Sequence, residues 1–457
     1  MLTPPLDNSG YKITIRIQLP LLAFDQTTLT KIRSIPSIAI PIVDNFTEDA
    51  TPWWLTTICR ASNNHLTKLR MKLIYTLLLL GMTFLLNAQS DILRINPNIV
   101  FPKDSIESKN LTTSLTNFLV SARKSNEENK FVFEPERIET FLLLDEFKGI
   151  EKSEKRKDDF FYKPYLTNIV PLKDSGYLVQ ISYIGTDDNT ALLRANFEFI
   201  AHKANDVFVF SSPLLRNTKN WKLESVGNNI FHYQDKINKD KTREFNKYTS
   251  SFDLKLKSTS KSTDCYCCDN IIELEKLIGV DYKADYNGRT EAVWSSTLDN
   301  KSLIVFGNNN AHFDDFDPHD LWHDRLSLVI ARSKVSRPVD EGCAYLYGGS
   351  WGLTWKDIFK AFKEQIASNR NVNWIDIKET PVYFKTKGFN NSADYVVNAL
   401  LVQKIEKEKG FAGVWDLLNV GPFEKDNAKY YQTLEKLTGI TKADYNDKIW
   451  ELIDNQK

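Results

Sequence analysis

The sequence predicts an α+β protein with two structured parts. Segments rich in aromatic and β-branched residues gather in its first half, and helical apolar spacing dominates its second half. The chain has 457 residues, enough for more than one domain. Hydrophobic residues make up 42% and charged residues 26%, as in an ordinary globular protein. Because the formal net charge is zero, the overall charge gives no reason to expect nucleic acid as a partner.

Residues 71–88 are typical of a secretory signal peptide: a methionine and a lysine, an apolar run, and a small residue at Ala88. The apolar run Leu73–Leu86 is too short to span a bilayer comfortably. We therefore expect a bacterial protein exported to the periplasm or the medium, with no transmembrane anchor after cleavage. Met71 is then the true start, and residues 1–70 come from an upstream start. The alternative is a buried apolar helix behind a genuine N-terminal domain.

The first part, residues 91–235, is expected to be an α+β roll in which helices precede a curved antiparallel sheet. The expected elements are helices over 111–123 and 134–148, then strands over 161–172, 177–184, 192–202 and 207–211, with Trp221 and 231–233 closing the set. This order is similar to cystatin-like and nuclear-transport-factor-like folds. It contains no cluster of titratable residues, which favours binding or support over chemistry.

The second part, residues 263–457, is expected to be mainly helical with a small sheet, and residues 236–262 predict a linker with some helix. A hairpin turn at Asp299-Asn300 is predicted between two short strands. The expected helices cover 270–278, 355–366, 391–408, 411–418 and 428–437.

Four cysteines remain after removal of the signal peptide: Cys265, Cys267, Cys268 and Cys343. An even number in an exported protein permits disulfides, and a bridge to Cys343 would brace the chain near Glu341. Buried free thiols are an equal alternative.

The strongest chemical signal is the segment His319-Asp320-Leu321-Trp322-His323, called HDLWH below. Two histidines four residues apart lie on one face of a helix, where both imidazoles reach one cation. Glu341 follows on the next expected helix and supplies an anionic third ligand. A catalytic zinc needs three protein ligands and an open position, and a carboxylate between the histidines takes a proton. Asp320 holds that last position.

With these residues the chain resembles the gluzincin family of zinc peptidases, in its broad peptidase-MA-like form, over residues 260–455. The resemblance rests on HDLWH, on residues 339–347, which are similar to the family's Glu-Gly-x-Ala-x-Tyr helix, and on the tail from 395 to 446. It implies a zincin-like domain with a small sheet beside an active-site helix. It also implies one zinc ion held by His319, His323 and Glu341, and hydrolysis of a peptide or protein substrate.

The sequence departs from the family pattern at three points. Asp320 stands where the family has Glu, and it is shorter by one methylene, about 1.5 Å. Since a misplacement of about 1 Å can cost ~100-fold in rate, we expect impaired hydrolysis with metal binding retained. Asp317-Pro318 is a strong helix start, which places His319 in the first turn. No oxyanion-stabilising residue is evident, and the sequence does not choose among Tyr345, Tyr347, Tyr383 and Tyr395.

Other interpretations stay open from the sequence. The two histidines of HDLWH can simply hydrogen-bond to carboxylates near a helix start. His312 with Asp314 or Asp317 can form a non-peptidase site, where hard oxygens suit calcium or manganese. Asp340 and Tyr345 are candidates for supporting or substrate contacts. The functional alternatives to an impaired zinc peptidase are a non-catalytic peptide- or surface-binding protein that keeps the peptidase fold, and a structural exported protein without metal.

Overall fold

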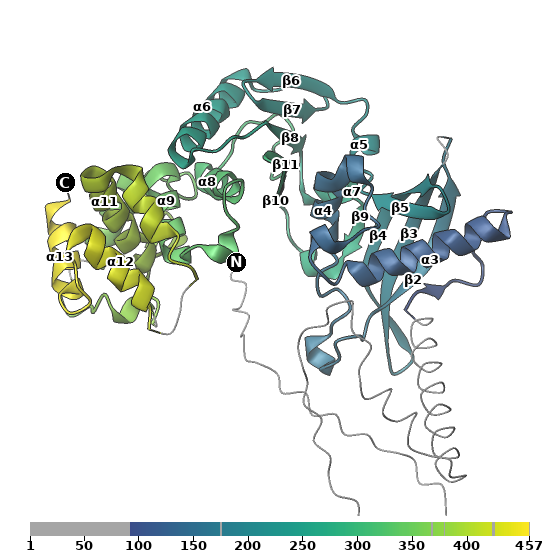
Figure 1. Ribbon diagram of the computed structural model, residues 1–457, viewed down its shortest axis with the longest axis horizontal. Coiled ribbons are helices and arrows are strands. Elements are labelled where there is room, and N and C mark those ends of the chain that lie inside the picture. Colours follow the sequence, from purple (N-terminus) through teal and green to yellow (C-terminus); the bar gives the residue numbers. More distant parts are fainter. Residues whose placement is uncertain (1–91, 174–175, 367–368, 379, 423–425, 457) are drawn as a thin grey trace, which may run out of the picture. The chain divides into compact units, whose positions relative to one another are not determined.

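The computed structural model describes residues 92–173, 176–366, 369–378, 380–422 and 426–456, and these form a mixed α+β structure (Figure 1). The expected signal peptide and the segment before it lie outside the described residues. In the described part of the chain, no helix combines the length and apolar character needed to cross a membrane.

The first sheet follows two helices in the chain, α3 (Ser105–Ser121) and α4 (Arg137–Asp145). Its main path runs β1-β2-β3-β4-β5, and every pair is antiparallel except β1 with β2. The strands are β1 (Arg94–Ile95), β2 (Lys163–Pro171), β3 (Gly176–Asp187), β4 (Thr190–Ala204) and β5 (Val207–Ser211). Phe118 of α3 packs on Phe199 and Phe210 of the sheet, so aromatic rings fill the space between the layers.

The second sheet has the order β10-β11-β8-β7-β6. Its strands are β6 (Lys222–Val226), β7 (Asn229–Tyr233), β8 (Ser262–Cys268), β10 (Ala292–Leu298) and β11 (Lys301–Gly307). Asp299 and Asn300 join β10 to β11 with φ angles of 51° and 64°, the left-handed conformation that the predicted turn requires. Successive residues of β8 and β11 point to opposite faces, and each face contributes to a different hydrophobic core. The sheet is therefore shared by the two cores.

Two expected boundaries differ in the structure. Residues 222–233, expected with the first sheet, form β6 and β7 of the second, while β9 (Val280–Lys283) pairs with β4 of the first. Most of the expected linker is the helix α6 (Lys239–Leu256), with Phe245, Phe252 and Leu256 buried. The remaining faces of α6 keep the Lys- and Asp-rich composition that suggested a linker, because an amphipathic helix needs only one apolar stripe.

The remaining elements are mostly helical, as expected. They are α5 (Leu214–Asn217), α7 (Ile271–Ile278), α8 (Pro318–Ser327), α9 (Arg337–Gly348), α10 (Trp355–Gln365), α11 (Ala393–Leu418), α12 (Ala428–Thr438) and α13 (Tyr445–Asn455), with the hairpin β12 (Tyr383–Thr386) and β13 (Phe389–Ser392). Short 3₁₀ helices are η2 (Asn126–Glu128), η3 (Glu134–Glu136), η4 (Glu154–Arg156), η5 (Ala284–Tyr286), η6 (Arg332–Lys334) and η7 (Asp376–Lys378). The two helices expected at 391–408 and 411–418 join in α11 across Gly410, which has non-helical backbone angles.

All four cysteines of the described chain are free and buried, so the structure has the thiol alternative and not a disulfide. Cys265 and Cys267 face one core and Cys268 faces the other, because neighbouring residues of a strand point to opposite faces. Burial raises the pKa of all four thiols, which keeps them protonated.

Helix α8 is fixed on one side by a buried ion pair. The guanidinium of Arg325 donates to both carboxylate oxygens of Asp253 on α6 at 2.7 Å and to the Thr263 hydroxyl at 2.8 Å. Arg325 is only 1% exposed, so the pairing is obligatory for a charge in that position. This contact sets the position of α8 against α6.

Helix α9 lies directly against α11 at Gly342. A Cβ atom at this position would lie 2.8 Å from the backbone nitrogen of Ala399 and 2.8 Å from the backbone carbon of Asn398. Backbone atoms cannot move aside as a flexible side chain does, so only glycine permits this approach. Gly342 thereby sets the position of its neighbour Glu341.

We expect Gly342→Ala to destabilise the protein by about 1–3 kcal/mol through overpacking of α9 on α11. Chemical denaturation of the wild-type and variant proteins measures this difference. An unchanged free energy of unfolding would show that the α9–α11 contact is looser than the structure indicates.

Candidate metal centre

The first turn of α8 presents His319, as the sequence predicts. Asp317 is the N-cap and accepts a hydrogen bond from the His319 backbone N–H at 2.9 Å, and Pro318 occupies the first helical position. His323 follows one turn later on the same face. The Nε2 atoms of the two histidines lie 3.2 Å apart.

Helix α9 brings Glu341 to the two histidines. Its Oε2 atom lies 3.2 Å from Nε2 of His319 and 3.5 Å from Nε2 of His323. Among the residues that the structure describes, these three form the one group of His, Cys, Asp or Glu side chains whose geometry could hold a metal ion. The predicted ligand set is therefore assembled in space.

Hydrogen bonds at the far side of each ring decide which nitrogen faces the centre. Nδ1 of His319 lies 2.9 Å from the carbonyl oxygen of Gly349, and Nδ1 of His323 lies 2.9 Å from Oδ1 of Asp340. A carbonyl and a carboxylate only accept hydrogen bonds, so both Nδ1 atoms carry the proton. In the neutral rings, both Nε2 lone pairs then point toward the Glu341 carboxylate. Three acceptor atoms converge, and a proton or a cation is needed between them.

Asp340 organises the residues behind the centre. It is 1% exposed and accepts hydrogen bonds from His323, from the Trp322 indole at 3.1 Å and from Arg332 Nε at 3.1 Å. Arg332 also lies 3.3 Å from Oε1 of Glu341, which leaves Oε2 to face the histidines. The sequence suggested Asp340 as a supporting residue. It gave no sign of Arg332, which begins the short 3₁₀ helix η6.

Without a bound cation, the pKa values of His323 and Glu341 differ from their ordinary values. Burial disfavours a charged His323, but hydrogen bonds to Asp340 and Glu341 outweigh it and raise the His323 pKa to about 9. Burial likewise opposes ionisation of Glu341, yet its hydrogen bonds to His319 and His323 hold its pKa well below the ordinary value. At neutral pH His323 therefore carries a proton, and its positive charge faces the carboxylates of Asp340 and Glu341.

Asp320 lines a cleft of about 660 Å³ into which His323 also opens. Partial burial and the charge of Asp317 raise the pKa of Asp320 above its ordinary value. Within the described chain its carboxylate has no side-chain hydrogen-bond partner, so it is available to a bound molecule. The cleft lies between α8 and the β10–β11 hairpin.

Two tyrosines, Tyr345 and Tyr395, lie near the centre. The ring of Tyr345 lies 5.6 Å from that of His319, but its hydroxyl donates to Asn391 Oδ1 and accepts from the Ser392 N–H, both at 3.4 Å. Tyr395 packs edge-on against Tyr345, and burial with the charge of Glu341 raises its pKa to about 12.

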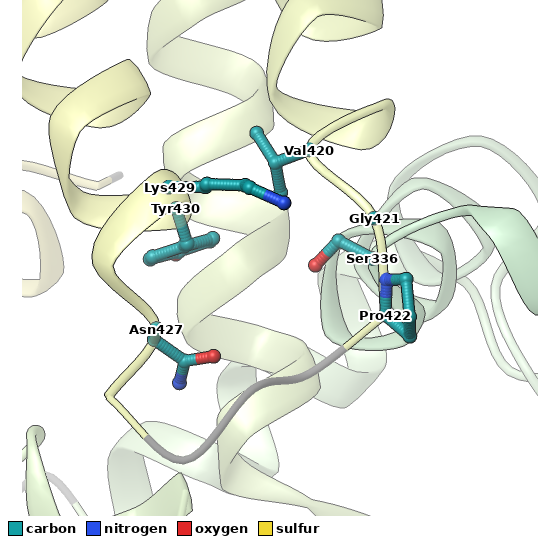
Figure 2. A pocket seen from close by; sticks show the side chains of 7 residues that line it. All are labelled: Ser336, Val420, Gly421, Pro422, Asn427, Lys429 and Tyr430. Carbon is teal, nitrogen blue, oxygen red and sulfur yellow. The ribbon is translucent and has the colours of Figure 1, made fainter. Parts of the chain in front are cut away.

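The structure separates His312 from this centre. Its ring lies 3.8 Å from Asp314, and no group of three ligands forms around it within the described residues. A second hollow lies between the α11–α12 loop and Ser336, beside Asn427 and Lys429 (Figure 2). Its volume of about 10 Å³ suits one water molecule, so it is too small for a substrate.

Comparison with known proteins finds no matching family model, no matching curated protein and no matching solved structure. The chemistry of the centre therefore rests on its own residues.

We expect the stability of the metal-free protein to fall between pH 7 and 9. A histidine pKa raised from 6.5 to about 9 on folding stabilises the fold below pH 6.5, and this contribution is lost as the pH rises through about 9. The pKa values of two carboxyl groups are also raised, to about 7 for Glu275 and about 6 for Asp324. Their titration changes the stability at lower pH than that of His323. Urea unfolding in EDTA measures the trend. If His323→Gln shows the same decline over this interval, another group is responsible.

Proposed function

We propose that the protein is a gluzincin-like zinc metallopeptidase-family protein, exported from a bacterial cell, whose peptidase activity is impaired. In this proposal a cystatin-like or nuclear-transport-factor-like roll precedes a zincin-like domain, and one zinc ion is held by His319, His323 and Glu341. The observation that carries the proposal is the convergence of three acceptor atoms with both Nδ1 atoms already bonded elsewhere.

The donor set suits zinc in both chemistry and spacing. Imidazole nitrogen and carboxylate oxygen are usual zinc ligands, whereas calcium and magnesium prefer oxygen alone. Ligand atoms about 2.05 Å from one ion at tetrahedral angles lie about 3.3 Å apart. The three observed separations, 3.2, 3.2 and 3.5 Å, are close to that value.

The residues behind the ligands support the same proposal. A metal-binding histidine commonly donates its other N–H to a carboxylate or a carbonyl, which fixes the ring and strengthens the free nitrogen as a ligand. His323 has Asp340 in this role and His319 has the Gly349 carbonyl. Arg332 holds the unused oxygen of Glu341. A role in orienting the three ligands gives a reason for placing Asp340, Arg332 and the Gly349 carbonyl behind the centre.

The cleft supports a peptide as the bound molecule. β10 is the edge strand of its sheet, so an extended peptide can pair with its free side while side chains enter the cleft. When bound, a zinc ion supplies Lewis acidity. Asp320 then provides a carboxylate oxygen to accept the proton of an attacking water, while His319, His323 and Glu341 fix the ion.

The short reach of Asp320 favours the second candidate, a non-catalytic protein that keeps the peptidase fold and binds a peptide or a cell-surface component. In this second candidate, the same cleft binds the peptide or surface component without hydrolysing it. The two candidates share the metal centre and differ only in whether a proton can be removed in the bound complex.

We expect metal analysis of the purified protein to find about one zinc ion per chain, lost in His323→Ala. His312→Ala is the matched control, since His312 is close in sequence but outside the ligand group, and it should keep the metal. A wild-type protein without metal after purification in zinc-containing buffer would refute the proposal.

We expect Asp320→Glu to raise the rate of peptide hydrolysis by up to ~100-fold, because the longer side chain restores the reach of the base. Hydrolysis of a casein-derived peptide mixture measures the rate, and equal zinc contents must be verified. Asp314→Glu lengthens a nearby carboxylate outside the cleft and should change nothing. Equal, measurable rates in wild type and Asp320→Glu would refute the argument from reach, whereas no detectable hydrolysis by either protein would favour the binding protein.

A further inference from the structure

The cleft beside α8 has an uneven distribution of charge. Its lining contains five carboxylates and a single guanidinium, in addition to His323. The carboxylates belong to Glu291, Asp315, Asp317, Asp320 and Asp324, and the guanidinium belongs to Arg332. Arg332 is already bonded to Asp340 and Glu341, so it does little to neutralise the cleft. The whole chain has a formal net charge of zero, which makes this a local property and not a consequence of composition.

One of these carboxylates is buried and has an oxygen without a hydrogen-bond donor. Asp324 is 6% exposed, and its Oδ1 accepts from the Ser302 hydroxyl at 2.7 Å. Its Oδ2 has no hydrogen-bond partner within the described residues. The nearest guanidinium nitrogen, Nη1 of Arg325, is 3.8 Å away and donates to Thr263. A buried oxygen without a donor leaves the charge of this carboxylate incompletely compensated, which adds to the negative charge of the cleft wall.

The other carboxylates differ in how they are engaged. Asp317 serves as the N-cap of α8, and Asp315 lies 3.9 Å from Lys241 on the surface. The side chains of Glu291 and Asp320 have no ion-pair or hydrogen-bond partner in the part of the chain that the structure describes. The cleft thus keeps unneutralised negative charge along its length, which attracts cations and raises their local concentration.

An aromatic platform borders the same cleft. The rings of Trp351 and Phe389 are stacked 5.2 Å apart with an angle of 2° between them, and they are 55% and 43% exposed. Trp351 has a φ angle of +53°, a strained value for a bulky residue, and its backbone N–H donates to Oδ2 of Asp317 at 3.3 Å. The N-cap of the metal-binding helix therefore also holds the platform. An exposed indole face beside carboxylates suits an organic cation.

The floor of the cleft indicates the form of the bound molecule. Val293 and Ser295 of β10 lie opposite Phe306 and Ile304 of β11, so these four side chains share one face of the hairpin. β10 is also the edge strand of this sheet, so its outer side suits pairing with an extended backbone. A metal ion alone would need neither the apolar floor nor the platform.

We infer that the cleft selects extended peptide segments that carry lysine or arginine side chains. The cation is received by the unneutralised carboxylates and the Trp351–Phe389 platform, and the peptide backbone lies along β10. The inference rests on the proposed function in one respect, since it assigns the specificity of the same cleft. It does not require that the bound peptide be hydrolysed.

The test uses the full chain and two fluorescein-labelled ten-residue peptides, identical except that lysines in one are replaced by glutamines in the other. Fluorescence anisotropy in EDTA gives both affinities without hydrolysis. The lysine peptide should bind at least about tenfold tighter, and the difference should shrink as salt is raised. Equal affinity for the two peptides would overturn the inference.

Variants assign the preference to the cleft. Glu291→Gln with Asp315→Asn should weaken lysine-peptide binding about tenfold, because both carboxylates line the cleft. Glu435→Gln with Asp447→Asn removes the same charge from exposed positions on α12 and α13 and should leave binding unchanged. An equal loss in both double variants would overturn the inference, since it would reflect overall charge.

Trp351→Gly tests the platform without adding backbone strain, because glycine adopts positive φ freely. We expect binding of the lysine peptide to weaken several-fold and binding of the glutamine peptide to change less. Unchanged lysine-peptide affinity would contradict the role given to the platform.

Zinc analysis of the same preparations separates this inference from the proposed function. Bound zinc without a preference for lysine would refute the inference alone. A preserved preference in a protein that takes up no zinc would refute the metal centre alone.

Discussion

Three acceptor atoms from two helices meet within 3.5 Å, and this convergence is the constraint on which the rest of the site depends. Such an arrangement is repulsive unless a positive charge lies between the atoms. In the metal-free state the charge is a proton, which explains why the pKa of His323 is raised although burial opposes it. A divalent cation meets the same need with more charge. A metal ion at this position would therefore have to displace a proton.

The fold brings these atoms together by fixing two helices independently. Helix α8 is held from one side by the buried Arg325–Asp253 pair. Helix α9 is positioned from the other side by the contact of Gly342 with the backbone of α11. Because each anchor is buried, the three side chains have little freedom to separate even without a cation between them. A preorganised site of this kind loses little conformational entropy on binding a metal.

Asp317 connects the metal centre with the cleft. One of its oxygens caps α8 at His319, and the other accepts from the backbone of Trp351 beside the aromatic platform. Asp317 therefore links the helix that presents His319 to the aromatic pair that borders the cleft. The cleft has features that a metal site alone does not need: an edge strand, an apolar floor and excess negative charge. They fit both a weak peptidase and a binding protein, and the short Asp320 side chain is what distinguishes those two candidates.

The sequence by itself determined the local features of the protein. The i, i+4 spacing of His319 and His323, the helix start at Asp317-Pro318 and the Asp299-Asn300 turn all depend on neighbouring residues, and the structure has each of them. The sequence also placed β2 to β5 of the first sheet, because their alternation and turn residues are local signals, but it gave no sign of β1 or of the pairing of β9. The tertiary structure alone decided the features that depend on packing between elements. These are the membership of β6 and β7 in the second sheet, the burial of α6, and the supporting contacts of Arg332. Hydrogen-bond partners far apart in the chain leave no periodic signal, so the orientation of the histidine rings and the charge of the cleft emerge only when the helices and sheet are packed together.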